Sequence, residues 1–394
     1  MIVLGVAGLF AFGTWQYTRL PVDAFPDISP IMVPVFADAH GMAPEEIERL
    51  ITFPIESSMN GLPGVTQVKS TSAFGMSVVY VYFKDSVDIY FARQLVAERL
   101  TAAAAELPAL EEPPVLGPIS TGLGQVFIYY LTIEKGADTG GKEPGMYLRE
   151  INDWMVKYQL RTVPGITDIL SVGGHVLQYQ IQVDPNALAQ YRISLEELVE
   201  AVRASNHNAG GQFMVLGSEE HLVRGIGLLG SLDDIRGIPV RTSGGVPITV
   251  GDVANVDYGG EIRRGVVSRN GTGEVVSGIV LQLYGENTSK VVDRLKRIMP
   301  DVQAALPPGV KLVPYYNQSE LVREATSTVK NSLLAGTFLV LLVLVAFMGN
   351  IRTAFIVALA LPFSALVSVI AIRWACIYAN LMSLGGIANA IGMI

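Results

Sequence analysis

Uncharged, apolar runs lie at both ends of the chain, whereas the segment between them mixes apolar and polar positions. Residues 1–18 carry no charge. Near the C-terminus, three further uncharged runs are separated only by Arg352 and Arg373. Because a membrane-spanning helix needs about 20 apolar residues, we expect one span at the N-terminus and three at the C-terminus. The three C-terminal runs are residues 332–351, 353–372 and 374–394.

The N-terminal run is predicted to remain as a membrane anchor. It lacks the Lys/Arg-rich start and the small-residue cleavage site of a secretory signal peptide. The alternative for all four runs is a set of buried helices, which would require a soluble core able to house segments such as residues 337–348. Charge does not fix the orientation, since the short loops between the C-terminal runs hold one arginine each.

The central segment contains an internal repeat. The sequence LPGVT at residues 62–66 recurs as VPGIT at residues 163–167, 101 residues later. A β-rich stretch with a glycine-centred turn follows each copy, at residues 67–85 and 168–184. Helical patterns lie before and after these stretches, so the order of strands and helices is repeated as well.

Local signals mark where individual helices begin. An apolar stripe over residues 47–59 follows Pro44, and proline is favoured at the first position of a helix. A second stripe covers residues 89–100. Ser194-Leu195-Glu196-Glu197 forms a capping box, and Asn287 can cap the helix that follows it.

The repeated order predicts an α+β membrane protein whose central segment folds as two split βαβ, ferredoxin-like subdomains. The second subdomain is expected to be interrupted between residues 206 and 264. That insert is rich in glycine and contains short β-like segments at Val246–Val250 and Val253–Val256. It is therefore predicted to be a separate small domain.

Composition and charge exclude several classes of protein. With 50% hydrophobic and 16% charged residues, and a mean hydropathy of +0.40, the chain is not intrinsically disordered. The net charge of −8 provides no electrostatic footprint for nucleic acid. One cysteine, Cys376, excludes a disulfide framework and a cysteine-based zinc site.

The sequence carries no motif for enzymatic chemistry, and neither an enzyme activity nor a cofactor is predicted. There is no GxGxxG before a helix, no Walker A lysine, no HExxH and no GxSxG. Asp23 and Asp27 could attract cations, but we favour a proline-rich exit from the first apolar run with solvated carboxylates. The four histidines are interpreted as surface or core residues rather than ligands: His40, His175, His207 and His221.

Two methionines in the last apolar run, Met382 and Met393, are the candidate metal ligands. Thioethers are soft ligands that suit monovalent copper and silver. On spacing alone, flexible apolar filling is the more common role of methionine. Asn389 in the same run is expected to face neighbouring helices, because polar residues in a bilayer hydrogen-bond across helices.

Several motifs resemble the heavy-metal efflux branch of the resistance–nodulation–division (RND) transporter superfamily. NLMSLGGIA at residues 380–388, with AIGM at 390–393, is similar to the start of that family's fourth transmembrane helix. PVDAFPDIS at residues 21–29 is similar to the exit from its first helix. Motifs that resemble its porter domain are Ala92-Arg93 after Tyr90-Phe91, Ser171-Val172-Gly173-Gly174 before Tyr179-Gln180, Ala204-Ser205-Asn206 with Ala209-Gly210-Gly211, and Arg263-Arg264-Gly265.

The resemblance implies the N-terminal part of a larger, proton-driven pump in the bacterial inner membrane, with a large periplasmic domain. It places the proton-carrying acidic residues and the main metal ligands beyond residue 394. The implied partners are two further copies in a homotrimer, a periplasmic membrane-fusion adaptor, an outer-membrane channel and the lipid bilayer, with no nucleic acid. The implied divisions are transmembrane helix 1 at 1–18, a first porter subdomain at 19–118, the first part of a second at 119–205, a docking-domain insert at 206–264, the completion of the second at 265–330, and transmembrane helices 2, 3 and the start of 4 at 331–394.

The residues around Met382 resemble the copper/silver branch of the family more than the zinc/cobalt/cadmium branch. In the copper/silver branch, a methionine at the position of Met382 belongs to a membrane relay for the soft ion. The second relay methionine would fall at Ile394, one residue after Met393, and one residue turns a helix by about 100°. The resemblance therefore favours Cu(I) or Ag(I) export, with Met382 as the relay candidate and Met393 as a weaker one.

Four other functions stay open at this point. The same family exports divalent zinc, cobalt and cadmium, and related RND pumps export drugs through an aromatic-lined pocket. A protein-export accessory with RND architecture is a more distant option. A membrane-anchored extracytoplasmic sensor would need neither three closely spaced helices nor a repeated βαβ domain.

Overall fold

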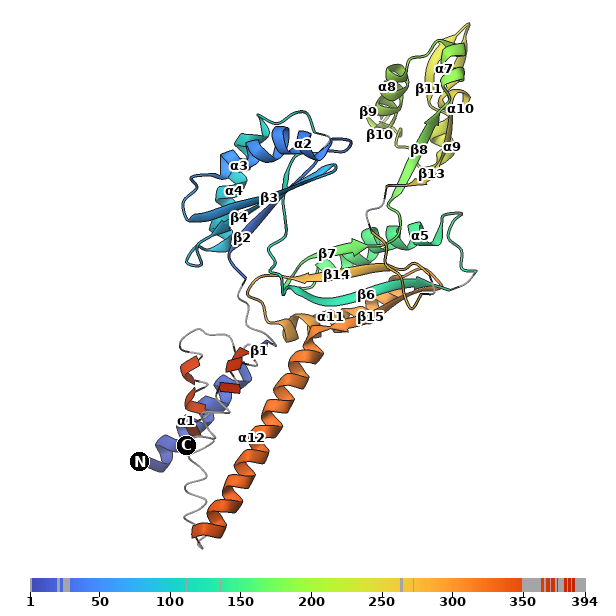
Figure 1. The fold of residues 1–394 in the computed structure, drawn as a ribbon. Coiled ribbons are helices and arrows are strands. Elements are labelled where there is room, and N and C mark those ends of the chain that lie inside the picture. Colours follow the sequence, from blue (N-terminus) through green and yellow to red (C-terminus); the bar gives the residue numbers. More distant parts are fainter. Residues whose placement is uncertain are drawn as a thin grey trace.

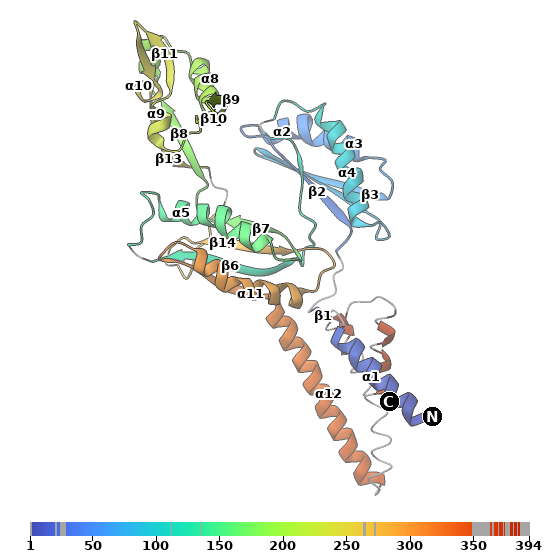
Figure 2. The ribbon, with the colours of Figure 1, turned by 180° about the vertical axis from the view of Figure 1, so that it is seen from behind.

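The computed structural model contains three α/β units and a helical end (Figure 1). The second unit lies in the middle, α12 leads away from it, and the first and third units rise on its opposite side in both views (Figures 1 and 2). The described residues are 2–19, 22–23, 29–110, 112–134, 136–262, 265–271, 273–348, 363–364, 366–368, 370–372, 374, 379–380, 382–383 and 385–386.

The first unit is an antiparallel sheet of order β3-β4-β2-β5 with its helices on one face. Ile47, Ile51, Ile55 and Met59 of the predicted stripe are all fully buried against it, whereas Leu50 is exposed. Gly75, with a φ of +72°, makes the tight turn of the β3–β4 hairpin. The elements are β2 (Met32–Asp38), α2 (Pro44–Ile47), a π-helical turn η1 (Glu48–Thr52), α3 (Phe53–Met59), β3 (Val65–Ala73), β4 (Met76–Phe83), α4 (Ile89–Ala104) and β5 (Val115–Leu116).

The second unit repeats this arrangement in the order β15-β6-β14-β7. In both sheets the fourth strand lies beside the first, and the third lies between the first and the second. One apolar core joins the sheet to α5, α6 and α11, so these helices cover the same face. The elements are β6 (Gln125–Ile133), α5 (Pro144–Ile151), a π-helical turn η2 (Asn152–Val156), α6 (Lys157–Arg161), β7 (Ile166–Val172), β14 (Val276–Gln282), α11 (Thr288–Ala305) and β15 (Val310–Asn317).

The third unit is inserted between β7 and β14 and is reached through the two-stranded ribbon β8–β13. Its core joins Ile193 and Leu198 to Ile235 and Val253, so the boundary predicted at residue 206 divides this core. Helix α8 belongs to the insert because its apolar side packs there. The elements are β8 (Leu177–Val183), α7 (Pro185–Tyr191), α8 (Leu195–Ser205), β9 (Ala209–Leu216), β10 (Glu219–Gly225), α9 (Leu232–Arg236), β11 (Pro239–Ser243), β12 (Val246–Thr249), α10 (Val250–Val253) and β13 (Ala254–Gly260).

The glycine-centred turn expected in residues 168–184 does not close a hairpin. β7 pairs with β14, whereas β8 pairs with β13 along its whole length. Gly173 and Gly174, at φ of +85° and +67°, instead carry the chain out of the sheet towards the third unit. The first unit closes a hairpin at the matching place because no insert follows its second strand.

The capping predictions are confirmed. Pro44 occupies the first turn of α2, and the Asn287 side chain accepts a hydrogen bond from the Lys290 backbone N–H at the start of α11. At α8, the Glu197 N–H donates to Ser194 Oγ at 3.1 Å, and the Ser194 N–H donates to Glu197 Oε2 at 2.8 Å. Two backbone donors at the start of the helix are therefore satisfied.

The capping box makes the start of α8 sensitive to acid. The Ser194 N–H and the Arg241 guanidinium hold the pKa of Glu197 below its ordinary value of 4.5. A lowered folded-state pKa gives stability that is present above the ordinary pKa and is lost as the pH falls. We therefore expect Glu197→Gln to speed hydrogen exchange in α8 at pH 7, with the difference from the parent shrinking below pH 4.5.

Glu196→Gln is the matched control, because Glu196 is its exposed neighbour in the same turn. It should leave the exchange of α8 close to that of the parent at pH 7. Equal exchange in both variants would contradict this account of the capping box.

The helical end contains α1 (Ile2–Arg19) and the long α12 (Gln318–Met348). A short parallel pair, β1 (Val22–Asp23) and β16 (Ala379–Asn380), lies between α1 and the units. Within the described residues, no helix combines the length and the apolar character that crossing a bilayer requires. The spans expected at residues 1–18 and 331–394 stay predictions, and much of 349–394 lies outside the described residues.

Candidate functional site

Met382 lies in the first turn of a helix that Asn380 caps. The Ser383 N–H donates to Asn380 Oδ1 at 2.9 Å, and the Asn380 N–H donates to Ser383 Oγ at 2.9 Å. This reciprocal pair satisfies two backbone donors and fixes the point at which the helix begins. The Met382 side chain is 75% exposed, so its thioether is open to the surroundings. Met393 and Asn389 lie outside the described residues.

The pairing of β1 with β16 brings two separate motifs of the sequence together. Val22 lies opposite Ala379 and Asp23 opposite Asn380, in parallel register. The exit from the first apolar run therefore lies beside the residues that precede Met382. The Asp27 carboxylate, also considered for cations, lies outside the described residues.

The described residues contain no group of three or more His, Cys, Asp or Glu side chains that could hold a metal ion. His40 Nε2 lies 3.9 Å from Glu261 Oε1, and His221 Nε2 lies 3.7 Å from Glu219 Oε2. Each of these histidines meets a single carboxylate. The interpretation of the four histidines as surface or core residues rather than ligands stays a prediction.

A cleft of about 480 Å³ separates the first unit from the second. Asp38 and Met76 line it from the first sheet, and Arg149 and Gly173 line it from the second unit. The contact between His40 and Glu261 bridges the two sides. Charged, polar and apolar side chains all line the cleft, and among the described residues no group of metal ligands converges on it.

A buried polar chain leads from the core of the second unit to this cleft. Tyr129 Oη donates to Asn152 Oδ1 at 2.8 Å, and Asn152 Nδ2 donates to Ser171 Oγ at 2.8 Å. Ser171 then donates to Asp153, which also accepts from Arg149 Nε at 2.7 Å. Burial, and next the charge of Asp153, raise the pKa of Tyr129, so its hydroxyl stays a donor.

Sequence reasoning missed this chain because its members are far apart in the sequence. The one local signal is Asn152, a polar residue within the buried stripe of α5 and η2. A π-helical turn begins at Asn152, and such turns often occur at functional sites. These hydrogen bonds link β6, α5 and η2 to the end of β7 beside the cleft.

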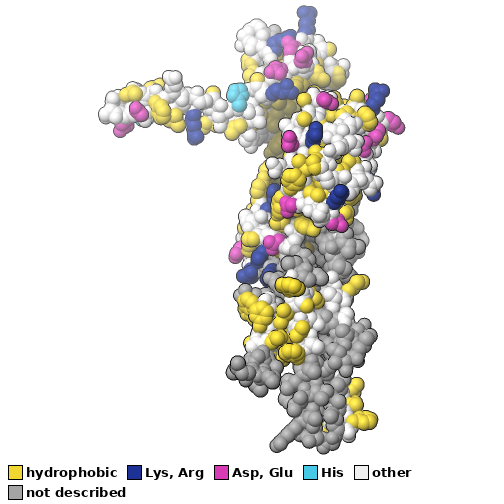
Figure 3. Space-filling view, turned by 90° about the vertical axis from the view of Figure 1, so that its left-hand side faces the viewer, with side chains coloured by type: hydrophobic (Ala, Val, Ile, Leu, Met, Phe, Trp, Pro, Cys, Tyr) yellow, Lys and Arg dark blue, Asp and Glu magenta, His cyan; other side chains and the backbone are white. Residues whose placement is uncertain are grey.

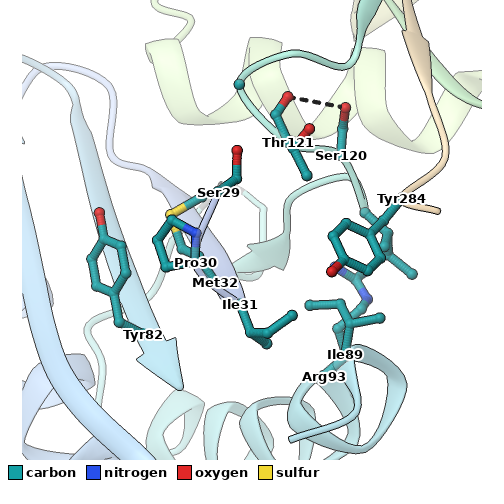
Figure 4. Close-up of a pocket in the computed structure, with 12 residues that line it drawn as sticks. Ser29, Pro30, Ile31, Met32, Tyr82, Ile89, Arg93, Ser120, Thr121 and Tyr284 are labelled. Atoms are coloured by element: carbon teal, nitrogen blue, oxygen red, sulfur yellow. Dashed lines mark hydrogen bonds between the residues drawn. The ribbon is translucent and has the colours of Figure 1, made fainter. Parts of the chain in front are cut away.

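A second cavity, of about 160 Å³, lies where the first unit meets the loops of the second (Figure 4). Arg93, from the quoted Ala92-Arg93 motif, reaches this cavity from α4 beside the ring of Tyr284, and Tyr82 lies opposite. Arg93 Nη1 donates to the Gly117 carbonyl at 2.5 Å. Burial lowers the pKa of the Arg93 guanidinium from its ordinary value.

The whole of this fold, including both repeated units and the insert, lies within one family match. The chain matches the AcrB/AcrD/AcrF family over residues 1–394. It belongs to this family. This confirms the RND resemblance of the sequence motifs. As a member of a transporter family, the protein is not an enzyme.

Relatives in this RND family include cation efflux proteins. The cation efflux system protein CzcA of Alcaligenes sp. (strain CT14) is 42% identical over 389 residues, which cover 98% of this chain and 36% of that protein. The cation efflux system protein CusA of Escherichia coli (strain K12) is 38% identical over 393 residues, covering 100% of this chain and 37% of that protein. The chain thus spans little more than a third of these relatives.

A crystal structure of a heavy metal efflux pump has the same fold. It matches with a TM-score of 0.88 and 35% identity, covering 98% of this chain and 38% of that structure. A second crystal form matches with a TM-score of 0.86 and 34% identity. The α+β architecture of this RND chain is therefore that of a heavy-metal efflux pump.

Proposed function

We propose that this chain is part of an RND pump that exports heavy-metal cations and is driven by protons. The observation that carries the proposal is the match to cation efflux proteins at 42% and 38% identity, which runs along almost the entire chain. The sequence has no Walker A lysine motif, so ATP is not the energy source within this chain. A proton gradient across the inner membrane supplies the energy instead.

In this pump, the uncharged runs at 1–18 and 331–394 cross the inner membrane, and the three α/β units lie in the periplasm. The first unit is the first porter subdomain, and the second unit is the second porter subdomain. Each has the strand order of a ferredoxin-like split βαβ fold, which supports this assignment. The third unit is the docking insert, carried away from the porter subdomains by the β8–β13 ribbon.

The transported ion is Cu(I) or Ag(I), with Met382 as one ligand of a relay. The side chain of Met382 supports this assignment because it combines a soft thioether with an exposed position on a capped helix start. Met393 would be a weaker second ligand. Divalent export is the second candidate, because CzcA of Cupriavidus metallidurans, a cobalt-zinc-cadmium resistance protein, is 42% identical to this chain.

The pump works as a homotrimer with a periplasmic adaptor and an outer-membrane channel. The β9–β10 hairpin supports contact between copies, because an isolated two-stranded hairpin is marginally stable in water. Within the described part of the chain, its two strands pair only with each other, and they carry exposed Phe213, Val215 and Leu222. Figure 3 shows an arm with apolar side chains projecting from the body of the molecule. A second copy of the chain would cover this arm.

A strain that lacks the full-length gene tests the proposal. We expect the strain to become sensitive to copper and silver and to regain tolerance when the parental gene is supplied. Tolerance to zinc, cobalt and cadmium should change less. If only the divalent metals become toxic, the assignment to copper and silver is wrong. If no metal becomes more toxic, metal export itself is wrong.

A further inference from the structure

The cavity around Arg93 lies at a joint between the first and second units. Three segments meet there: the start of β2, the connection of residues 117–124 that follows β5, and the loop between β14 and α11. Backbone hydrogen bonds hold this joint, with the Tyr284 N–H donating to the Ile119 carbonyl at 3.2 Å. Anything bound in the cavity would therefore touch both units.

Arg93 brings a positive charge into this joint, and no carboxylate of the described residues pairs with it. Among the described residues, no Asp or Glu oxygen lies within 4.0 Å of its guanidinium, whereas Arg149 has Asp153 at 2.7 Å and Arg294 has Glu286 at 3.5 Å. The Gly117 carbonyl accepts from Nη1 and fixes the side chain. Arg93 is half-buried, and its one acceptor among the described contacts is the neutral Gly117 carbonyl, so its remaining N–H donors can bind a ligand in the cavity.

The remaining walls of the cavity combine hydroxyl groups with apolar side chains, among them Ile31, Ile89 and Ile119. Ser120 and Thr121 contribute side chains from the connection, and Figure 4 shows their hydroxyls on the side away from α4. The ring of Tyr284 lies beside Arg93. A volume of 160 Å³ is about ten times the space that one water needs, so a polyatomic ion fits.

We propose that this cavity binds a phosphate group, with Arg93 as its charged anchor. The planar guanidinium presents five donors in a geometry that matches phosphate oxygens, and only one is occupied by Gly117 among the described contacts. The Thr121 hydroxyl donates to the opposite oxygens, and so does the Ser120 hydroxyl once it turns from the Thr121 carbonyl oxygen, to which it donates at 3.4 Å in the structure. The phosphate supplies a negative charge beside Arg93 and ties the first unit to the second at their joint.

The phosphate has two physical sources, free inorganic phosphate and the headgroup of a phospholipid. The cavity begins six residues after β1, which adjoins the helical end of the chain. If a bilayer surrounds α1 and α12, the phospholipid headgroups at its surface lie near this cavity. The cavity recognises a phosphate group in both cases, and the two arms of the experiment distinguish free phosphate from a lipid headgroup.

The test uses the full-length pump, purified in phosphate-free detergent and stripped of lipid. Inorganic phosphate is titrated against sodium chloride of equal ionic strength, and the unfolding midpoint is followed. A ligand that binds only the folded state raises this midpoint with its concentration. In a parallel arm, phosphatidylglycerol is added and the bound lipid is counted by native mass spectrometry.

We expect the parent to respond in at least one arm, and the responding arm identifies the source. Arg93→Gln should weaken that response at least about ten-fold, because a hydrogen bond to a charged group is lost. Arg99→Gln removes the same charge from the exposed face of the same helix and should respond like the parent. Arg93→Lys should recover part of the binding, since the charge remains but the fork of donors is lost.

No response of the parent in either arm would overturn the proposal, and so would an Arg93→Gln response equal to that of the parent. If Arg93→Gln does not assemble, the double variant Ser120→Ala with Thr121→Val carries the test, because it keeps the arginine. Weaker binding in that variant supports the site, and unchanged binding contradicts it. Metal transport is not measured, so the result does not depend on the proposed function.

Discussion

Gly174→Ala is expected to detach the end of β7 from α5 and to destabilise the second unit by about 3 kcal/mol or more. Gly174 has a φ of +67°, and alanine in the left-handed region costs about 1–2 kcal/mol. An added Cβ would lie 2.5 Å from the Gly145 carbonyl oxygen, 2.8 Å from Val276 Cγ2 and 3.0 Å from Arg149 Cβ. The closest of these is backbone, so relief requires α5 to move.

The measurement is hydrogen exchange of the α5 and β7 peptides in the full-length protein, which reports local opening. Gly141→Ala is the matched control. Gly141 has a similar φ of +77°, but nothing lies within 4 Å of its added Cβ. Gly141→Ala should show only the cost of placing alanine in the left-handed region, without a steric clash. Equal protection of α5 and β7 in both variants would mean that the close approach between the Gly174 and Gly145 backbones does not affect the stability of the second unit.

Met382→Ile in the full-length pump is expected to lower Cu(I) and Ag(I) export about ten-fold or more, by analogy with the loss of groups that support metal ligands. Isoleucine keeps a similar bulk but removes the sulfur, and such volume-conserving changes cost less than about 1.5 kcal/mol. Expression and assembly should therefore be preserved. Thioethers do not titrate near neutral pH, so the proton coupling of the pump should also be unchanged.

Met299→Ile is the control, because Met299 lies on α11, partly buried against the core of the second unit and far in sequence from the capped helix at Asn380. It should export at the parental rate. Parental export by Met382→Ile as well would show that the thioether is packing material. If the Met382→Ile trimer falls apart while the Met299→Ile trimer is intact, Met382 acts in assembly and the relay assignment is wrong.

Features that depend on neighbours in the sequence are predicted correctly. The capping box of Ser194 and Glu197 forms because both partners lie within one helical turn. The turn at Gly75 closes a hairpin because β3 and β4 follow each other directly. Ser194 and Glu197 are three residues apart, as are the paired residues Ala73 and Met76 that flank the turn. The pattern of residue types over such a short segment is sufficient to identify these partners.

Features that depend on distant segments are predicted poorly. The sequence predicts that the insert begins at residue 206. Leu198 nevertheless packs in the core of the insert together with Val253, and no local sequence pattern reveals a contact between residues so far apart. The turn at Gly173 likewise resembles that of a hairpin, yet β14, more than 100 residues further on, takes the place beside β7. Strand pairing across an insertion is decided by burial in three dimensions.

The candidate site follows the same division. Met382 was identified by its chemistry and by its motif, and the cap at Asn380 agrees with a helix that starts there. The sequence presents Arg93 only as part of a motif, because its place in a cavity between two units depends on segments that are distant in the sequence. The pairing of Asp23 with Asn380 lies beyond any local signal.

The most direct test of the account is transport by the full-length pump in proteoliposomes under an imposed proton gradient. Rates are compared for Cu(I), Ag(I), Zn²⁺, Co²⁺ and Cd²⁺, with a gradient-free preparation as the reference. The account predicts transport that depends on the proton gradient and is fastest for Cu(I) and Ag(I). Transport restricted to the divalent cations would contradict the assigned substrate, and gradient-independent leakage of all five would contradict a proton-driven metal pump.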